Sequence, residues 1–370
     1  MALTKYTLGE LLVRNTENNE ELTYEAASVR GLLNTKGISN TKVNIDGRDL
    51  SKFLVVRPGG FVFNHRVHDK LGLGYNTSNE TYLFTNDYVA FYVRPEIENT
   101  ILSPDYLYIW FLRPEFDRYM LFKTYGSATL FFNWDNMCEL EISLPDIIVQ
   151  QKYVDIYNSM LANQQSYERG LEDLKLVCDG YIEDLRRTVS CEEIGPFISE
   201  VNARNFDLRV ANARGVNSSG NFDETRANTA GLDFRNYKIV KSGQFAYNPS
   251  RINLGSIALQ SCEDCIVSPM YIVFRIRDDK KLLSEYLMLW FSRKEFQRST
   301  LFYATGSVRD IFTFDLMKRV QIPIPDIKVQ KAIANIYQVY ITRKRISEQL
   351  KAQIKDICPI LIRGSLEEGG

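Results

Sequence analysis

The sequence has very little histidine and lacks a phosphate-binding loop. Only two histidines, His65 and His68, occur in 370 residues, and one His-x-x-His is far more typical of a surface loop than of a zinc site. A single Cys-x-x-Cys, residues 262–265, supplies two ligands where a structural zinc site needs four. The pattern G-x-x-x-x-G-K-[ST] is absent, which excludes a P-loop NTPase. We therefore expect neither a metal site nor nucleotide hydrolysis in this chain.

Long apolar runs and regular cysteine spacing are also missing. No run approaches the ~20 apolar residues that span a bilayer, and no signal peptide opens the chain. The six cysteines follow no regular spacing, which disfavours a disulfide framework. The net charge of −1 argues against a polycation that coats nucleic acid, although it says nothing of local patches. These absences predict a soluble protein of the cytoplasm.

Two near-matches to catalytic motifs fail for chemical reasons. Asn-Pro at 248–249 begins like the N-P-P-[FYW] motif of DNA amino-methyltransferases, but the second proline and the aromatic residue are missing. Pro-Asp at 145–146 and at 325–326 each precedes a Gln-Lys pair, as in PD-(D/E)xK nucleases, but glutamine cannot replace the metal-binding carboxylate. We interpret Asp146 and Asp326 as charges at helix N-termini, where the helix dipole favours a carboxylate.

The strongest positive signal is an internal repeat. Residues 106–157 and 286–337 share an ordered set of motifs at a constant offset of 180 residues. The set comprises Tyr-Leu, Trp-Phe, Arg-x-Glu-Phe, Gly-Ser, an apolar segment that ends on Pro-Asp, and a helical Gln followed by Ile-Tyr. Solenoid repeats are about 20–50 residues long, so this period indicates a duplicated domain. With 45% hydrophobic residues, each copy can bury a core of its own.

Each copy is predicted to be an α+β or α/β globule of short strands and helices. Apolar runs at 53–59 and 237–243 lead through glycine turns into Phe-x-aromatic-Asn segments, which we interpret as β-hairpins. Ser103 and Ser284 are expected to cap the helices that follow them. Alternation predicts further strands at 88–93, 271–276, 138–144 and 319–324.

A long helix with heptad spacing is predicted after each copy. In the first helix, steps of four and three place the following residues on one seam, with Gln164 its polar member: Tyr153, Tyr157, Met160, Gln164, Tyr167, Leu171, Leu174, Cys178, Tyr181 and Leu185. The second seam contains Ile333, Ile336, Tyr340, Leu350, Ile354 and Ile357. Pro359 is expected to end the second helix.

Charge indicates that these two helices pair with each other. Residues 146–188 carry a net charge of −3 and residues 326–370 a net charge of +3. A helix of about 40 residues is roughly 60 Å long. If the helices lie antiparallel, the two globules occupy opposite ends of a rod. The alternative is a pair of core helices inside one compact domain.

The loops of both copies carry side chains suited to DNA. Arginine reads guanine and asparagine reads adenine through paired hydrogen bonds, while Ser, Thr and main-chain amides hold phosphates. The candidates are Lys42, Phe63, Asn64, Arg66, Ser127, Thr129 and Asn133 in the first copy, and Arg214, Arg226, Tyr247, Asn248, Arg251, Ser307 and Arg309 in the second. Phe63 has no hydroxyl, so an apolar contact with DNA and a core position both stay open for it. The copies differ most in these loops, so we expect them to read different sequences.

Together these features resemble the specificity subunit of Type I restriction-modification systems, over essentially the whole chain. The resemblance rests on the duplicated layout, the Gly-Ser loops, Gly-x-Phe-x-Tyr-Asn at 243–248 (Phe63 replaces the tyrosine in the first copy) and Gln-x-x-Ile-x-x-Ile-Tyr at 330–337. It implies two target recognition domains separated by two long antiparallel coiled-coil helices, with a pseudo-two-fold repeat. The implied segments are recognition domains at 1–145 and 189–325 and spacer helices at 146–188 and 326–370.

The resemblance also implies a subunit that is not itself an enzyme. Each domain would read one half of a split, asymmetric site in double-stranded DNA, and the chain would dock two methyltransferase subunits within a complex that adds restriction and translocase subunits. S-adenosylmethionine, ATP and Mg²⁺ would belong to those partners. The first copy departs from expectation in being less basic, with 14 Lys/Arg against 18 Asp/Glu over residues 1–145.

Two alternatives remain open at the level of sequence. One is the specificity subunit of a related system in which methyltransferase and nuclease are fused. The other is a coiled-coil scaffold with two protein-binding modules and no DNA role. Salt-dependent binding to a DNA duplex distinguishes the scaffold, because only phosphate contacts release counterions.

Overall fold

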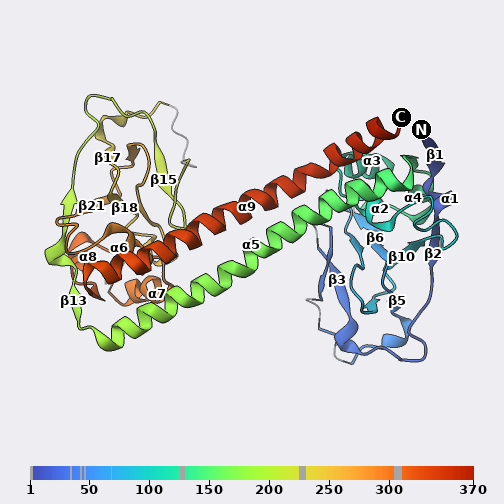
Figure 1. The fold of residues 1–370 in the computed structure, drawn as a ribbon, viewed down its shortest axis with the longest axis horizontal. Helices are drawn as coiled ribbons and strands as arrows, with labels where there is room; N and C mark the ends of the chain where they lie inside the picture. The colour runs from blue at the N-terminus through green and yellow to red at the C-terminus, as the bar shows by residue number, and fades with distance from the viewer. Residues whose placement is uncertain are drawn as a thin grey trace. The chain divides into compact units, whose positions relative to one another are not determined.

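The computed structural model describes residues 3–33, 36–41, 44–45, 47–67, 69–125, 130–224, 231–303 and 311–370 (Figure 1). Packing divides the chain into two units. Unit 1 contains residues 1–166 and 346–370, and unit 2 contains residues 167–345. Both long helices contribute to both units, so each unit consists of one globular module and a segment of each helix.

The central sheet of unit 1 has four antiparallel strands in the order β2 (Leu12–Asn15), β10 (Tyr88–Val93), β6 (Phe61–Asn64) and β8 (Leu73–Tyr75). Short two-stranded pairings accompany it. They are β1 (Thr4–Thr7) with β12 (Glu141–Leu144), β3 (Arg30–Leu32) with β4 (Ile38–Asn40), β5 (Leu54–Val56) with β9 (Tyr82–Phe84), and β7 (Arg66–Val67) with β11 (Leu130–Phe131).

Unit 2 repeats this topology. Its central sheet has the order β14 (Ile198–Val201), β21 (Ile272–Ile276), β18 (Gln244–Tyr247) and β19 (Ile257–Leu259). The accompanying pairs are β13 (Cys191–Glu193) with β22 (Gln321–Pro323), β15 (Arg214–Val216) with β16 (Phe222–Glu224), and β17 (Lys238–Val240) with β20 (Cys265–Val267). The repeated motifs therefore produce one strand order twice.

The shorter helices follow the same duplication. Unit 1 has α1 (Leu8–Leu11), α2 (Pro104–Phe111), α3 (Pro114–Lys123) and α4 (Trp134–Cys138), and unit 2 has α6 (Ser284–Phe291), α7 (Lys294–Tyr303) and α8 (Phe314–Lys318). Single 3₁₀ turns occur at Ala26–Ser28, Leu50–Lys52, Gly195–Phe197, Phe234–Asn236 and Ile252–Leu254. The aromatic faces of α2 and α6 lie in the two main cores, as predicted.

A buried glutamine joins each module to its long helix. Gln150 is fully buried; its Nε2 donates to the carbonyls of Ile101 and Pro145, and its Oε1 accepts from the Ser103 amide. Gln330 makes the three equivalent bonds in unit 2. A buried polar group without a hydrogen-bond partner costs free energy. Each glutamine therefore holds the segments that it bonds in a defined geometry.

The long helices are α5 (Ile147–Thr188) and α9 (Ile327–Gly369), and their segments run antiparallel within each unit. In unit 1, Lys152 forms an ion pair with Glu368 at 2.8 Å, whereas Gln164, further along α5, bonds Ser347, which comes earlier in α9. Both Gln164 and Ser347 are buried, and a buried polar pair of this kind favours one helix register. The aspartates that precede the helices accept from Ile148 and Lys328 amides, as predicted.

The predicted hairpins are wrong in their pairing. The glycine turns form, with φ of 82° at Gly59 and 81° at Gly243, a backbone conformation that glycine adopts without strain. However, β5 pairs with β9, and β6 pairs with β10 and β8. The turn therefore carries the chain out of the β5–β9 pair and into the central sheet. The same exchange occurs in unit 2.

Two predictions about helix ends also need correction. Leu283, not Ser284, is the N-cap of α6, and it gives no side-chain bond. Helix α9 continues through Pro359 to Gly369. A proline inside a helix costs about 3 kcal/mol, but the residues around it are buried in the core of unit 1, and their burial offsets that cost: Cys358, Leu361 and Ile362.

The predicted seam of α5 shifts by one position near its C-terminal end. Tyr181 is half exposed, while its neighbour Ile182 is fully buried in the core of unit 2. The shift arises because this part of α5 packs against the globular module, so its buried face no longer follows the helix–helix heptad. Cys138 is likewise misplaced by the strand prediction, since it ends α4 and the strand begins at Glu141.

Candidate nucleic-acid interface

Six of the predicted DNA-contacting residues lie outside the described residues: Lys42, Ser127, Thr129, Arg226, Ser307 and Arg309. The other eight are Phe63, Asn64, Arg66, Asn133, Arg214, Tyr247, Asn248 and Arg251. For these eight, the structure separates residues that build the loops from residues that are exposed to solvent.

The Asn of the Phe-x-aromatic-Asn motif forms a turn in both modules. Asn64 Oδ1 accepts from the Arg66 amide at 3.0 Å, and Asn248 Oδ1 accepts from the Ser250 amide at 3.0 Å. An asparagine that bonds the amide two residues ahead fixes a local turn. Asn248 is only 6% exposed, and its Oδ1 is engaged in the turn, so its structural role is to shape this loop.

The turn after each asparagine meets the segment that follows the Gly-Ser loop. The carbonyl of His65 accepts from the Phe132 amide at 2.9 Å, and the carbonyl of Pro249 accepts from the Phe312 amide at 2.9 Å. In unit 1 the contact extends into the β7–β11 pair. The structure therefore brings together two of the predicted loop regions, which are far apart in sequence, and it does so at the same place in both modules.

The two aromatic candidates, Phe63 and Tyr247, are core residues. Both are fully buried, and Phe63 packs edge-on against Phe91 and Phe132. A side chain with no exposed surface cannot touch DNA, so both are removed from the candidate interface. Burial also raises the pKa of Tyr247, and its hydroxyl has no hydrogen-bond partner among the described residues.

Asn133 has a structural role as well. It is the N-cap of α4, where its Oδ1 accepts from the Asn136 amide at 2.8 Å, and Asn136 returns the bond to the Asn133 amide. This reciprocal capping box satisfies two amides that the helix leaves unpaired. The Oδ1 of Asn133 therefore serves to start α4.

Three arginines remain as candidates for DNA contact in the described part of the chain. Arg66 on β7 has a side chain 55% exposed, in a long ion pair with Asp87 at 3.7 Å. Arg251 is exposed, and Arg214 on β15 is half-buried, with its Nε donating to Asn212 Oδ1 at 2.7 Å. Exposed guanidinium groups match both phosphates and the guanine edge.

A buried lysine that the sequence interpretation missed holds the tip of the β3–β4 hairpin in unit 1. Lys36 Nζ donates to the Phe111 carbonyl at 2.6 Å and forms an ion pair with Asp117 at 2.8 Å. Its side chain is 4% exposed, and burial lowers its pKa, opposed by Asp117. Phe111 ends α2, where the helix dipole favours a cation. In unit 2, Gly220 and Gln297 stand at the positions that match Lys36 and Asp117, and both line a cavity of about 310 Å³.

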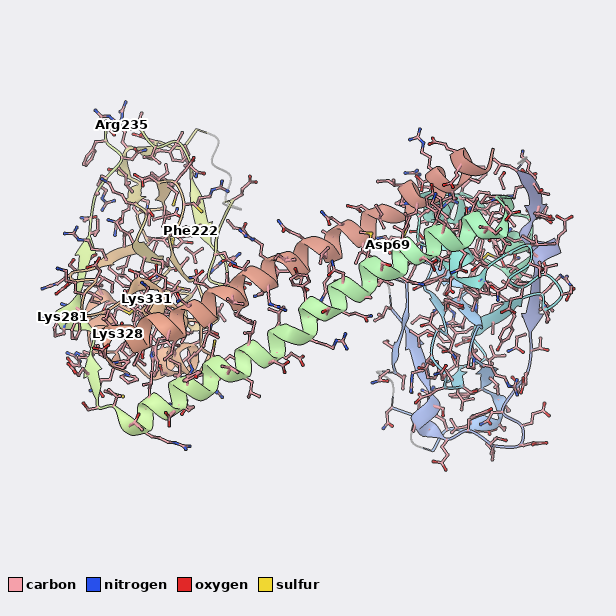
Figure 2. All side chains as sticks on the ribbon, viewed as in Figure 1. Asp69, Phe222, Arg235, Lys281, Lys328 and Lys331 are labelled. Carbon is pink, nitrogen blue, oxygen red and sulfur yellow. The ribbon has the colours of Figure 1, made fainter. Side chains whose placement is uncertain are left out.

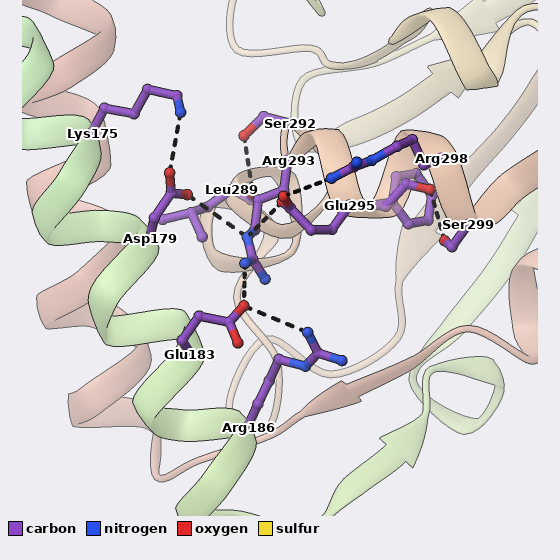
Figure 3. Close-up of polar contacts among 11 residues, drawn as sticks. Lys175, Asp179, Glu183, Arg186, Leu289, Ser292, Arg293, Glu295, Arg298 and Ser299 are labelled. Atoms are coloured by element: carbon purple, nitrogen blue, oxygen red, sulfur yellow. Dashed lines mark hydrogen bonds and ion pairs between the residues drawn. The ribbon is translucent and has the colours of Figure 1, made fainter.

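The Arg of each Arg-x-Glu-Phe motif stacks on the Trp of the preceding helix. In unit 2, Arg293 lies over the Trp290 ring. It contacts Glu183, Asp179 at 3.8 Å and Glu295 at 3.7 Å (Figure 3). Its side chain is 6% exposed, and its hydrogen bond holds the pKa of Glu183 below the usual range. The motif's repetition at 180 residues was the signal for this site, but nothing in the sequence places α5 beside it.

The equivalent arginine of unit 1, Arg113, has a different environment. It lies over Trp110 at 4.5 Å and its Nε donates to the Trp110 carbonyl at 3.0 Å. No carboxylate forms an ion pair with it among the residues that the structure describes. The positions matching Asp179 and Glu183 are Pro359 and Arg363, because α9 occupies the place that α5 occupies in unit 2.

Unit 2 also carries exposed lysines that were not selected from the sequence. Lys281, Lys328 and Lys331 lie near one another at the beginning of α9 (Figure 2). Within the described ranges, no group of three or more His, Cys, Asp and Glu side chains is placed to hold a metal ion. Over the same ranges, no helix is both long and apolar enough to cross a membrane.

Comparison with known proteins shows what this chain is similar to. Residues 209–356 match the family model described as the Type I restriction modification DNA specificity domain. No curated protein matches the sequence significantly. The fold is similar to the S subunit of a Type I restriction-modification system from M. genitalium, at 10% identity and a TM-score of 0.61, covering 99% of this chain and 95% of that chain.

Two further solved structures match with lower scores. One is the HsdS subunit from Thermoanaerobacter tengcongensis (13% identity, 98% of this chain and 96% of that chain, TM-score 0.41). The other comes from a study of complex assembly and conformational transition of the type I R-M system (12% identity, 98% of both chains, TM-score 0.46). Residues 209–356 are thus similar to the Type I DNA specificity domain, and the fold is similar to that of a Type I S subunit over nearly the whole chain.

Proposed function

We propose that this chain is the DNA-recognition subunit of a Type I restriction-modification complex, with each module reading one half of a split, asymmetric site. One observation carries the proposal: the globular module of unit 2 lies largely within the matched specificity domain, and unit 1 has the same strand order in its central sheet. A recognition domain present twice has two readers. The two copies differ most in their loops, so the two half-sites differ.

In this proposal the chain binds DNA and leaves the chemistry to its partners. Arg66, Arg214 and Arg251 supply contacts to bases and phosphates, together with residues of the Gly-Ser loops. Two methyltransferase subunits dock on the chain, restriction and translocase subunits complete the assembly, and S-adenosylmethionine, ATP and Mg²⁺ bind to those subunits. The complex acts on DNA in the cytoplasm.

Salt dependence of duplex binding tests the DNA role. Binding through phosphates weakens linearly on a logarithmic scale as salt rises, with a slope of about −0.9 per neutralised phosphate. Replacing Arg251 with glutamine should reduce that slope by about one if it holds a phosphate, with Arg209, another exposed arginine of unit 2, as the control. A chain that binds no duplex at low salt, alone or with a methyltransferase subunit, would be a scaffold instead. Methyl transfer by the purified chain alone would contradict a non-catalytic role.

We further propose that the paired helices set the spacing between the half-sites. Four residues inserted after Gln164 and after Lys344 add about 6 Å and a residual rotation of about 40°, which is close to one base-pair step of 34–36°. Such a variant should prefer a spacer longer by one or two base pairs. Three inserted residues leave a residual of about −60° and should mostly abolish binding. Selection from a library of spacer lengths measures both, and an unchanged spacer in a tightly binding four-residue variant rules out this role.

A further inference from the structure

A groove in unit 1 lies beside Arg113, which forms no ion pair with a carboxylate among the described residues. The groove has a volume of about 480 Å³ and is lined by Arg113 and Glu115 from the α2–α3 corner and by the last turns of α9 (Pro359, Ile360, Ile362, Arg363, Leu366 and Glu367). The other charged groups that line it are already in ion pairs: Glu115 with Arg118 at 3.1 Å, and Arg363 with Glu367 at 3.2 Å. Arg113 is the charged group of the lining without an ion pair among the described residues, and the only carboxylate whose charge acts on it there is the more distant Glu115.

The internal repeat shows what such an arginine binds. Arg293 has the same stacking on a tryptophan, and its guanidinium contacts Asp179 and Glu183, which are four residues apart on one helix. Residues four apart lie on the same face of a helix, one turn from each other. In unit 1 the matching helix positions are Pro359 and Arg363, so α9 supplies no carboxylate to Arg113 from these two positions.

The groove also has an apolar component. Ile360 is 63% exposed at its edge, while Ile362 is buried and closes its floor. The groove therefore presents an exposed isoleucine and a guanidinium that forms no ion pair among the described residues. These groups are complementary to an amphipathic segment that carries carboxylates and an apolar side chain. Arginine suits this purpose because its planar fork binds carboxylates while its face stays stacked on the ring.

We propose that this groove is a docking site for an acidic helix of a partner protein, with two carboxylates one turn apart that bind Arg113. The guest lies against α9 and the α2–α3 corner and supplies the charges that α5 supplies in unit 2. This inference does not depend on DNA reading by either module. A negative result in the peptide experiment below would not contradict the proposed function, and a negative result in the duplex-binding experiment would not contradict the docking site.

The probe is a labelled peptide with the sequence of residues 173–188 and Cys178→Ser, which contains the two carboxylates. Its binding to the full-length protein is measured by fluorescence anisotropy at low salt. The matched control peptide carries Asp179→Asn and Glu183→Gln. We expect the acidic peptide to bind about tenfold more tightly than the control, because charge-assisted bonds to a guanidinium are lost. Equal binding of the two peptides, or no binding of either, overturns the proposal.

Protein variants locate the peptide. Arg113→Met should remove the preference for the acidic peptide, whereas Arg118→Met, an exposed arginine on the same helix, should keep it. Ile360→Glu tests the site without touching a buried side chain, since it places a carboxylate of the chain's own beside Arg113 and should weaken the acidic peptide about fivefold or more by competition. An acidic peptide that binds all three variants like the wild type binds elsewhere, and the proposal fails.

Discussion

Replacing Arg293 with methionine should destabilise unit 2, because it removes the ion pairs that this arginine forms with three carboxylates. The arginine is 6% exposed, and Asp179, Glu183 and Glu295 are 40–51% exposed. Breaking a fully buried ion pair costs about 3–5 kcal/mol, and an exposed pair contributes about 0–1 kcal/mol. Because the carboxylates can rehydrate after the arginine is removed, we expect an intermediate loss of about 2 kcal/mol.

The duplication supplies a matched control. Arg113→Met removes the same side chain from the same stacking position in unit 1, but no ion pair is lost there among the described residues. We expect it to cost about 1 kcal/mol or less, mainly as lost packing of the arginine stem. The measurement is urea unfolding of the full-length variants by circular dichroism. For a folded unit of this size, 2 kcal/mol corresponds to a fall in Tm of about 4–8 °C.

The pH dependence gives a second readout of Arg293→Met. The pKa of Glu183 is lowered by its bond to Arg293, so this pair stabilises the fold above the unfolded pKa of about 4.3 and is lost as pH falls through the folded value. The difference in stability between wild type and variant should therefore be full near pH 6–7 and shrink below about pH 4.5. Equal losses for the Arg293 and Arg113 variants, or a difference that does not change with pH, would refute the reasoning.

Two further predictions follow from the same contacts. Lys36→Met alone should lower the free energy of unfolding by about 3 kcal/mol, because it leaves Asp117 nearly buried and unpaired. Lys36→Met combined with Asp117→Leu should return stability to within about 1 kcal/mol of wild type. Thermal unfolding measures both, and a double variant no more stable than the single one contradicts the prediction. Residues 1–188 should self-associate more tightly than residues 189–370. When two copies of the first fragment pair, the acidic end of α5 from one copy reaches Arg113 of the other. When two copies of the second fragment pair, Arg363 of one copy reaches Arg293 of the other, and the like charges repel. Sedimentation equilibrium measures both associations, and equal association of the two fragments would count against the argument.

The sequence alone determined the features that depend on local periodicity. The repeat at 180 residues, the two long helices and some of the strands, such as β10 and β21, follow from patterns within a few turns or residues of each other. Ser103 caps α2, and Asp146 and Asp326 bond the first amides of the long helices, because a cap acts over two or three residues. Such interactions are written in adjacent positions and need no knowledge of the rest of the fold.

Only the tertiary structure decided which chemically suitable side chains are available to a ligand. Phe63 and Tyr247 belong to motifs next to the predicted interface, yet the sheet and the aromatic core bury them completely. Pairing of β5 with β9 rather than β6 depends on strands nearly 30 residues apart. Hydrophobic burial is not directional, so a periodic pattern shows that a face is buried but not against which partner.

The two charged clusters show the same limit most clearly. Lys36 and the Phe111 carbonyl are 75 residues apart in sequence, and Arg293 and Glu183 are 110 apart. The shared motif does not distinguish Arg113 from Arg293, since both lie in Arg-x-Glu-Phe after Trp-Phe. Their environments differ because α9 lies beside one and α5 beside the other, and the charge that each helix presents at that point is set by long-range packing.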